Sequence, residues 1–222
     1  MIFAENILVC IVAPFLVALW FVKGEVRQYL TAFLLGMGGS LMAAYIGGYF
    51  GTILEMGQND TSIFISPMVE ETMKLLMLIL FLVLINPGDR SLVMLSVAIG
   101  TGFATFENCC YILSFGADSL SYIIIRGLAV GVMHIVSVLS LAMWIICIKW
   151  LKAVSLSGII GGLSLAMIYH SIYNLLVSEP GLSRVVGYVL PILSAVCLYP
   201  MYRKLMNLLK NKNLKNFLNF TE

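Results

Sequence analysis

Two adjacent glutamates and a lysine, Glu70, Glu71 and Lys74, lie inside an otherwise apolar stretch of this sequence. A charged side chain in the hydrocarbon region of a membrane costs at least about 2.5–3.5 kcal/mol, so such residues are rarely kept without a use. Carboxylates can activate water as a general base and return its proton as a general acid. The first question about this chain is therefore what these groups do inside a membrane.

Further polar residues interrupt later apolar stretches, namely Glu107 and Asn108 shortly after Phe103, then Arg126, His134, His170 and Asn174. Glu70 and Lys74 are spaced i,i+4, which predicts an ion pair along one helix face and leaves Glu71 freer to act elsewhere. His170 and Asn174 have the same spacing, so we expect Asn174 to orient the imidazole or to bind a substrate group.

The composition points to the lipid bilayer. Of the 222 residues, 61% are hydrophobic and 11% are charged, whereas a soluble domain is about 25% charged. This composition argues against a soluble enzyme or a nucleic-acid-binding protein. It predicts one all-α, polytopic membrane bundle that occupies residues 1–222, because helices satisfy their backbone groups without water.

Apolar runs separated by turn and charged residues predict about seven transmembrane helices. We place them at residues 2–22, 29–54, 63–85, 91–115, 119–148, 153–177 and 182–202. The first run has no basic residue before Lys23 and no clear cleavage site, so a retained span is favoured over a cleaved signal peptide.

Basic residues are concentrated on one side of this predicted topology: Lys23, Arg27, Arg90, Lys149, Lys152, Arg203, Lys204, Lys210, Lys212 and Lys215. The opposite links hold only Arg184. The positive-inside rule then predicts an outer N-terminus and a cytoplasmic C-terminus. The basic tail, residues 203–222, either lies on the anionic inner surface or is a frayed terminus.

On this topology, polar groups from four helices reach one level, about 10–12 Å below the outer surface. They are Glu70, Glu71, Glu107, Arg126 and His170, and His134 lies deeper. Groups that share a layer can share a water-filled cavity, which is how such residues are normally accommodated.

Four motifs in this order carry a resemblance to a known family: Glu70-Glu71-x-x-Lys74, Phe103-Ala104-x-x-Glu107-Asn108, Arg126 with His134 eight residues later, and His170-x-x-x-Asn174. Across residues 66–174 the chain resembles the PrsW-type intramembrane proteases, bacterial enzymes that make the first cut in membrane-bound anti-sigma factors. Prenyl (CAAX) endopeptidases and bacteriocin-immunity proteins are wider relatives that usually have a histidine where this chain has Glu107, which favours the PrsW side.

The resemblance implies a multi-pass protease of the bacterial plasma membrane that acts in stress signalling. Its substrate would be a single-pass membrane protein, such as an anti-sigma factor, and the cut would fall near the outer leaflet. The identity of the substrate, the activating signal and the oligomeric state stay open.

Two mechanisms of hydrolysis remain open, and the metal-free one is slightly preferred because the sequence has no His-Glu-x-x-His motif. In it, Glu71 or else Glu70 activates water, and His134 or His170 assists the leaving amine. In the other, a catalytic Zn²⁺ binds a set drawn from four residues, His134, His170, Glu71 and Glu107.

The remaining polar residues have supporting roles in either mechanism. Asn108, Asn174 or Arg126 would contact the oxyanion or the substrate backbone. Two other functions compete with proteolysis. Intramembrane charges are also typical of proton-coupled transporters, although no internal repeat of the transporter kind is visible. A membrane binding or immunity protein without catalytic activity is the third alternative.

Overall fold

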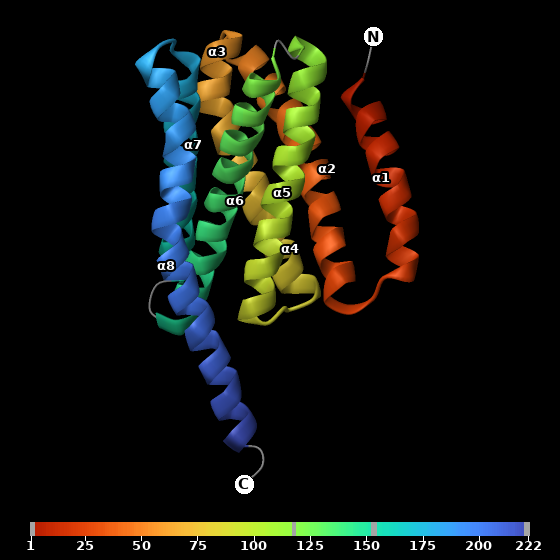
Figure 1. Ribbon diagram of the computed structural model, residues 1–222, viewed down its shortest axis with the longest axis vertical. Helices are drawn as coiled ribbons and strands as arrows, with labels where there is room; N and C mark the ends of the chain where they lie inside the picture. Colours follow the sequence, from red (N-terminus) through yellow and green to blue (C-terminus); the bar gives the residue numbers. More distant parts are fainter. Residues whose placement is uncertain (1–2, 117–118, 152–154, 220–222) are drawn as a thin grey trace.

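The computed structural model describes residues 3–116, 119–151 and 155–219, and every regular element in these ranges is helical (Figure 1). The elements are α1 (Ala4–Phe21), α2 (Gly24–Ile53), the short α3 (Gln58–Asp60), a π-helical turn η1 (Thr61–Ile65), α4 (Ser66–Leu84), α5 (Asp89–Phe115), α6 (Leu120–Leu151), α7 (Ser155–Ser178) and α8 (Leu182–Asn219). The predicted all-α bundle is confirmed.

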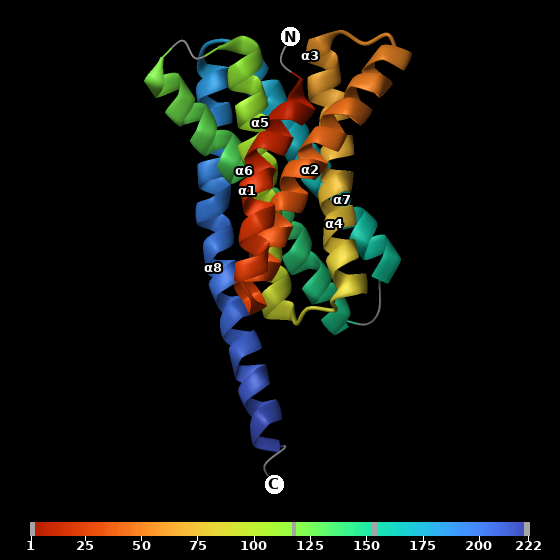
Figure 2. The same cartoon turned by 90° about the vertical axis from the view of Figure 1, so that its right-hand side faces the viewer.

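Most of these helices have the length and the composition of membrane spans. Among the described residues, α1, α2, α5, α6, α7 and α8 are long and apolar enough to cross a membrane. The charged helix α4 has 19 residues, and at 1.5 Å per residue it extends about 28 Å, close to the thickness of a hydrocarbon core. Figure 2 shows α4 running along the bundle beside α2 and α7.

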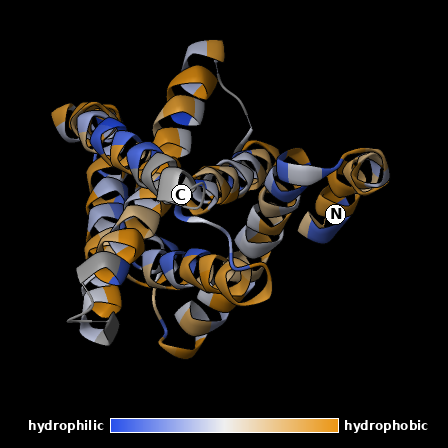
Figure 3. Ribbon diagram, turned by 90° about the horizontal axis from the view of Figure 1, so that it is seen from below, coloured by the Kyte–Doolittle hydropathy of each residue, from blue (hydrophilic) through white to orange (hydrophobic). Residues whose placement is uncertain are grey.

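The distribution of polarity is that of a protein dissolved in lipid. Large apolar side chains face outward, with Trp20 83% exposed and Phe21 81% exposed, while the ionisable Glu71 and Lys74 are 0% exposed. Seen along the bundle axis, hydrophobic residues recur along the helices all around the bundle (Figure 3). An exposed apolar surface of this extent requires a partner other than water.

Several predicted boundaries differ from the observed ones. The second span begins earlier than expected, at Gly24, and the third begins later, at Ser66, because α3 and η1 precede it. Pro67 stands in the first turn of α4, where its missing N–H group costs no helical hydrogen bond. The last helix does not end at residue 202 but continues to Asn219.

Some predicted positions lie outside the described residues: 1–2 of the first span, 117–118 beside the fifth, 152–154 beside the sixth, and 220–222 of the tail. The described chain enters α1 at one end of the bundle, and α8 leaves the bundle at the opposite end (Figure 1). This arrangement agrees with an odd number of crossings. Which end faces the cytoplasm remains a prediction from the charge distribution.

Helices α2 and α5 approach each other closely enough for their backbones to touch. A Cβ atom added at Gly102 would collide with the carbonyl oxygen of Phe33, and one added at Gly36 would collide with that of Ile99. Small residues at such a crossing let two membrane helices pack by direct van der Waals contact. The crossing fixes the height at which α5 presents its polar residues.

The first helix, in contrast, lies at the edge of the bundle (Figure 1) and has no buried residue. Its packing contacts are with α2. The Tyr45 hydroxyl donates a hydrogen bond of 2.5 Å to Glu5, and the rings of Phe15 and Phe33 lie 5.9 Å apart. The candidate site is therefore built by the helices that follow α1.

Candidate active site

Four helices, α4, α5, α6 and α7, bring the predicted site residues together. On α4, the buried positions include Glu71, Lys74, Leu75 and Leu78, which recur every three or four residues and so form one stripe. Both charged side chains on this stripe must point into the bundle. The neighbouring Glu70 lies at the edge of the stripe and is half-buried.

The Glu71 carboxylate uses both of its oxygens in hydrogen bonds. Its Oε1 atom lies 2.6 Å from Lys74 Nζ and 2.8 Å from His170 Nδ1. Its Oε2 atom accepts a hydrogen bond from the Ser137 hydroxyl. We call Glu71, Lys74 and Ser137 the floor of the site, because all three are buried and the other two are hydrogen-bonded to Glu71. A buried carboxylate with three hydrogen-bond partners holds those partners in place.

The predicted pairing of Lys74 is wrong in its partner, because the ion pair forms with Glu71 at 2.6 Å rather than with Glu70. The reason is the buried stripe of α4: Lys74 is fully enclosed, and the carboxylate that shares its enclosure is that of Glu71. Lys74 Nζ also lies 2.7 Å from His134 Nδ1 and 4.7 Å from the centre of the Phe103 ring. This removes the argument for preferring Glu71 as the base.

A second group of polar residues is more open to the surroundings. Glu107 Oε2 lies 2.5 Å from His134 Nε2, and Glu107 Oε1 lies 3.4 Å from Arg126 Nη2. The Arg126 guanidinium stacks on Tyr111, 3.3 Å from the ring centre. The side chains of Arg126 and Glu107 are 16% and 32% exposed. We call Glu107, Arg126 and Tyr111 the rim of the site.

His134 reaches the cluster although its sequence position predicts a greater depth. Its ring lies 5.2 Å from that of His170, edge to face, and 5.0 Å from Phe103. Helix α6 is inclined across the bundle in Figure 2, and inclination reduces the depth gained by each residue along the helix. His134 therefore joins the floor, through Lys74, to the rim, through Glu107.

Glu70 is the carboxylate that remains available. Its Oε2 atom is buried without a hydrogen-bond partner among the described residues, and it faces His170 Nε2 at 3.7 Å. Buried polar atoms are normally paired, so an exception requires an explanation. Glu70, His134 and His170 each present one possible metal-ligating atom, and these atoms lie within 4.8 Å of one another.

The chemistry of these three groups fits a metal ion. Two imidazoles and one carboxylate are a common ligand set for catalytic zinc. Behind each imidazole stands a second carboxylate, Glu71 at His170 and Glu107 at His134, as is usual for metal-bound histidines. Both ring nitrogens of His134 are hydrogen-bonded, so a metal ion would require His134 to give up one of these contacts.

The ligand set predicted from the sequence thus changes in one respect. Glu70 groups with His134 and His170, whereas Glu71 and Glu107 lie beside the imidazoles as hydrogen-bond partners. The sequence alone could not distinguish Glu70 from Glu71, because both are adjacent on the same helix.

The two predicted asparagines have different surroundings. Asn174 does not orient His170: its Nδ2 group donates to the Ser62 carbonyl oxygen at 2.8 Å, which ties α7 to the π-helical turn before α4. Asn108 Oδ1 and Arg126 Nε are buried without a hydrogen-bond partner among the described residues. An unpaired acceptor and an unpaired donor near the rim are suited to bind a peptide main chain, which offers both.

Ser137 and Tyr111 contribute to the site without having been predicted from the sequence. Ser137 follows His134 by three residues on α6, so helical spacing would have placed it on the same face. Serine is common in membrane helices, and its hydroxyl often bonds to its own backbone. Only the position of Glu71 on a neighbouring helix gives this serine its role.

Residues 24–202 match the family of PrsW intramembrane metalloproteases, and the chain belongs to this family. No curated protein and no solved structure matches the chain. The family match confirms the resemblance, and it identifies a membrane-embedded protease rather than a carrier or an immunity protein. The family's description as metalloproteases favours the metal-dependent mechanism over the metal-free one that the sequence slightly preferred.

Proposed function

We propose that this protein hydrolyses a peptide bond in the juxtamembrane segment of a single-pass membrane protein, at a site formed by Glu70, His134 and His170. One observation carries the proposal: three possible ligand atoms lie within 4.8 Å of one another inside a membrane bundle, and the Glu70 oxygen is buried and unpaired among the described residues.

We assign Glu70, His134 and His170 as the ligands of a divalent metal ion, with Zn²⁺ as the expected ion. When bound, Zn²⁺ would polarise the scissile carbonyl and acidify a water molecule. The task of the floor is then to orient one ligand. Glu71 holds His170 through Nδ1, which leaves Nε2 directed at Glu70. Ser137 and Lys74 in turn hold Glu71.

Glu107 is placed to act as the general base and acid. It is the most exposed of the three carboxylates in the site, with 32% of its side chain exposed, against 15% for Glu70 and 0% for Glu71. It lies at 2.5 Å from His134, so it is adjacent to the proposed metal ligands. A carboxylate in that position can accept the proton of the attacking water and transfer it to the leaving amine.

The rim provides the contacts for the substrate. Arg126 Nε and Asn108 Oδ1 supply one unpaired donor and one unpaired acceptor, which complement a peptide C=O and N–H group. The rim lies toward the end of the bundle where α5 ends and α6 begins. On the topology predicted by the positive-inside rule, this end is extracellular, so the cut would fall near the outer leaflet.

A protease of this geometry suits the first step of a proteolytic cascade. Shortening the outer part of a membrane-anchored regulator would leave a remnant that a second protease can cut within the membrane. We propose an anti-sigma factor of the bacterial plasma membrane as the substrate, and a stress response as the process that its cleavage starts.

Co-expression with a single-pass substrate that carries an outer juxtamembrane segment tests the activity. The wild type should shorten the substrate, whereas Glu70→Gln and His170→Ala should not. Glu5→Gln is the matched control, because Glu5 is a carboxylate on α1 that contacts Tyr45 and lies outside the site. Cleavage that persists in Glu70→Gln and His170→Ala would refute the site assignment.

Metal content of the purified chain tests the second part of the proposal. About one Zn²⁺ per chain is expected in the wild type and much less in His170→Ala, with cleavage lost on chelation and restored by added Zn²⁺. A cleaving enzyme that contains no metal and ignores chelators would overturn the metal ligand assignment while leaving the protease activity intact.

A further inference from the structure

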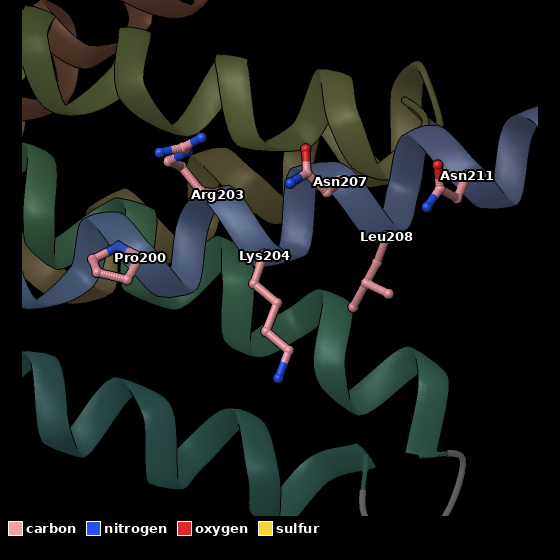
Figure 4. Close-up of a pocket in the computed structure, with 6 residues that line it drawn as sticks. All are labelled: Pro200, Arg203, Lys204, Asn207, Leu208 and Asn211. Atoms are coloured by element: carbon pink, nitrogen blue, oxygen red, sulfur yellow. The ribbon is translucent and has the colours of Figure 1, made fainter.

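The end of α8 forms a basic groove that the proposed proteolysis does not use. The groove has a volume of about 400 Å³ and is lined by Pro200, Arg203, Lys204, Asn207, Leu208 and Asn211 (Figure 4). Residues 203–219 lie beyond the part of the chain that matches the family. We propose that this groove binds the headgroup of an anionic phospholipid from the inner leaflet.

The depth of the groove places it at a headgroup. The apolar part of α8, residues 182–202, is about 31 Å long at 1.5 Å per residue, which equals the thickness of a hydrocarbon core. Arg203 and Lys204 follow at once and are exposed. Figure 1 shows that α8 continues past the ends of the neighbouring helices. Arg203 and Lys204 come before this extension, on the exposed side of the helix, at the level that the length of residues 182–202 predicts for the membrane interface.

Packing fixes the direction in which the groove faces. Leu205 and Leu209 are buried and belong to the apolar core of the bundle, so they hold this stretch of α8 against the bundle. The groove-lining residues Lys204, Asn207 and Leu208 are exposed. Figure 4 shows Arg203 and Asn207 directed to one side of the helix and Lys204 and Leu208 to the other. A headgroup in the groove can therefore meet a cation on either flank.

Charge selects an anionic occupant. The sequence between Pro180 and Thr221 contains no aspartate or glutamate, while Arg203, Lys204 and Lys210 are followed by further lysines. The inner leaflet carries a negative surface potential that attracts basic segments next to a membrane helix. Arginine and lysine bind a phosphate group through charge-assisted hydrogen bonds. The side-chain amides of Asn207 and Asn211 can donate further hydrogen bonds to the same phosphate.

A lipid-binding measurement on the full-length chain tests this inference. The purified protein is titrated with phosphatidylglycerol and, separately, with phosphatidylcholine, and the bound lipid is counted by native mass spectrometry. The wild type should prefer phosphatidylglycerol. Arg203→Gln/Lys204→Gln should reduce that preference by about fivefold for each charge removed. Lys210→Gln is the matched control, because it removes an exposed charge of α8 that does not line the groove.

Each other outcome counts against the groove. An unchanged preference in the double variant, or an equal loss in Lys210→Gln, would show that general charge attraction is responsible. Release of bound phosphatidylglycerol by millimolar inorganic phosphate would identify a soluble phosphate site instead. If the double variant does not fold, the single variants Arg203→Gln and Lys204→Gln decide: each should lower the preference about fivefold, and a loss no greater than that in Lys210→Gln would refute the inference.

Discussion

The floor and the rim of the site each contain a glutamate paired with a basic residue, but the two pairs differ in burial. In the floor, the Glu71–Lys74 pair has both side chains fully buried. In the rim, the Glu107–Arg126 pair is longer, at 3.4 Å, and its side chains are 32% and 16% exposed. A buried ion pair must stay intact because a lone buried charge is very unfavourable, whereas a partly exposed pair can be exchanged for other partners. We therefore expect the floor to keep the site residues in position and the rim to contact the substrate.

Glu70 lies between these regions, and Glu70→Gln should have the largest effect on activity. The amide keeps the size of the side chain but is a poor metal ligand. We expect cleavage to fall by more than about 10²-fold, because even loss of a hydrogen-bond partner of a metal ligand costs about 10–100-fold, with little change in stability because Glu70 Oε2 has no hydrogen bond among the described residues to lose. Initial cleavage rates in proteoliposomes provide the measurement. A rate near that of the wild type would show that Glu70 is not a metal ligand.

Lys74→Met should damage the fold more than any substitution in the rim. It leaves the Glu71 carboxylate buried without its cation, which costs about 3–5 kcal/mol. Unfolding of the purified variant in detergent measures this loss. Glu71→Gln added to Lys74→Met should restore part of the stability, because it removes the unpaired charge. If Lys74→Met alone were as stable as the wild type, the floor would not be the rigid region.

Arg126→Gln tests the opposite expectation for the rim. Loss of a charge-assisted hydrogen bond to the substrate should raise KM by about tenfold, whereas the pair with Glu107 should contribute no more than about 1 kcal/mol to stability because it is partly exposed. Cleavage measured against substrate concentration separates KM from kcat. A variant that unfolds, or one that loses kcat alone, would remove the distinction between the two regions.

Ser137→Ala should have the smallest effect of the four on cleavage. It deletes one hydrogen bond to Glu71 and leaves a buried carboxylate oxygen unpaired, at a cost of about 1–3 kcal/mol. If Ser137 positions His170 through Glu71, kcat should fall severalfold with KM unchanged, and Ser137→Thr should recover part of it. Ser140→Ala, one turn further along α6, serves as the control. Equal kinetics for the Ser137 and Ser140 variants would reduce Ser137 to a packing residue.

Much of this arrangement was readable from residue types. The apolar runs predicted the bundle, and the convergence of Glu70, Glu107, Arg126 and His170 from four helices followed from counting residues along each span. The positions of single boundaries were less accessible. The π-helical turn before α4 depends on how the loop packs against α7, where Asn174 binds the Ser62 carbonyl oxygen, and nothing local in the sequence specifies that contact.

The division of labour between Glu70 and Glu71 was beyond the sequence for a physical reason. Both lie on α4 within reach of Lys74, at i,i+4 and i,i+3, and both spacings allow a pair. The choice is made by His170 on α7 and Ser137 on α6, which both bind Glu71. The reach of His134 likewise depends on the inclination of α6 in Figure 2, which residue counting along a straight helix does not include.

The glycine crossing of α2 and α5 has a consequence for how this enzyme loses activity. Gly36 is packed against the backbone of Ile99 and Phe103, and Phe103 carries the ring that lies against His134 and Lys74. A single added methyl group at Gly36 or Gly102 would push α5 away from α2. Because Glu107 is on α5, it would be displaced from the site. A random screen for inactive variants would thus collect changes at glycine codons as well as at the codons of the reacting residues.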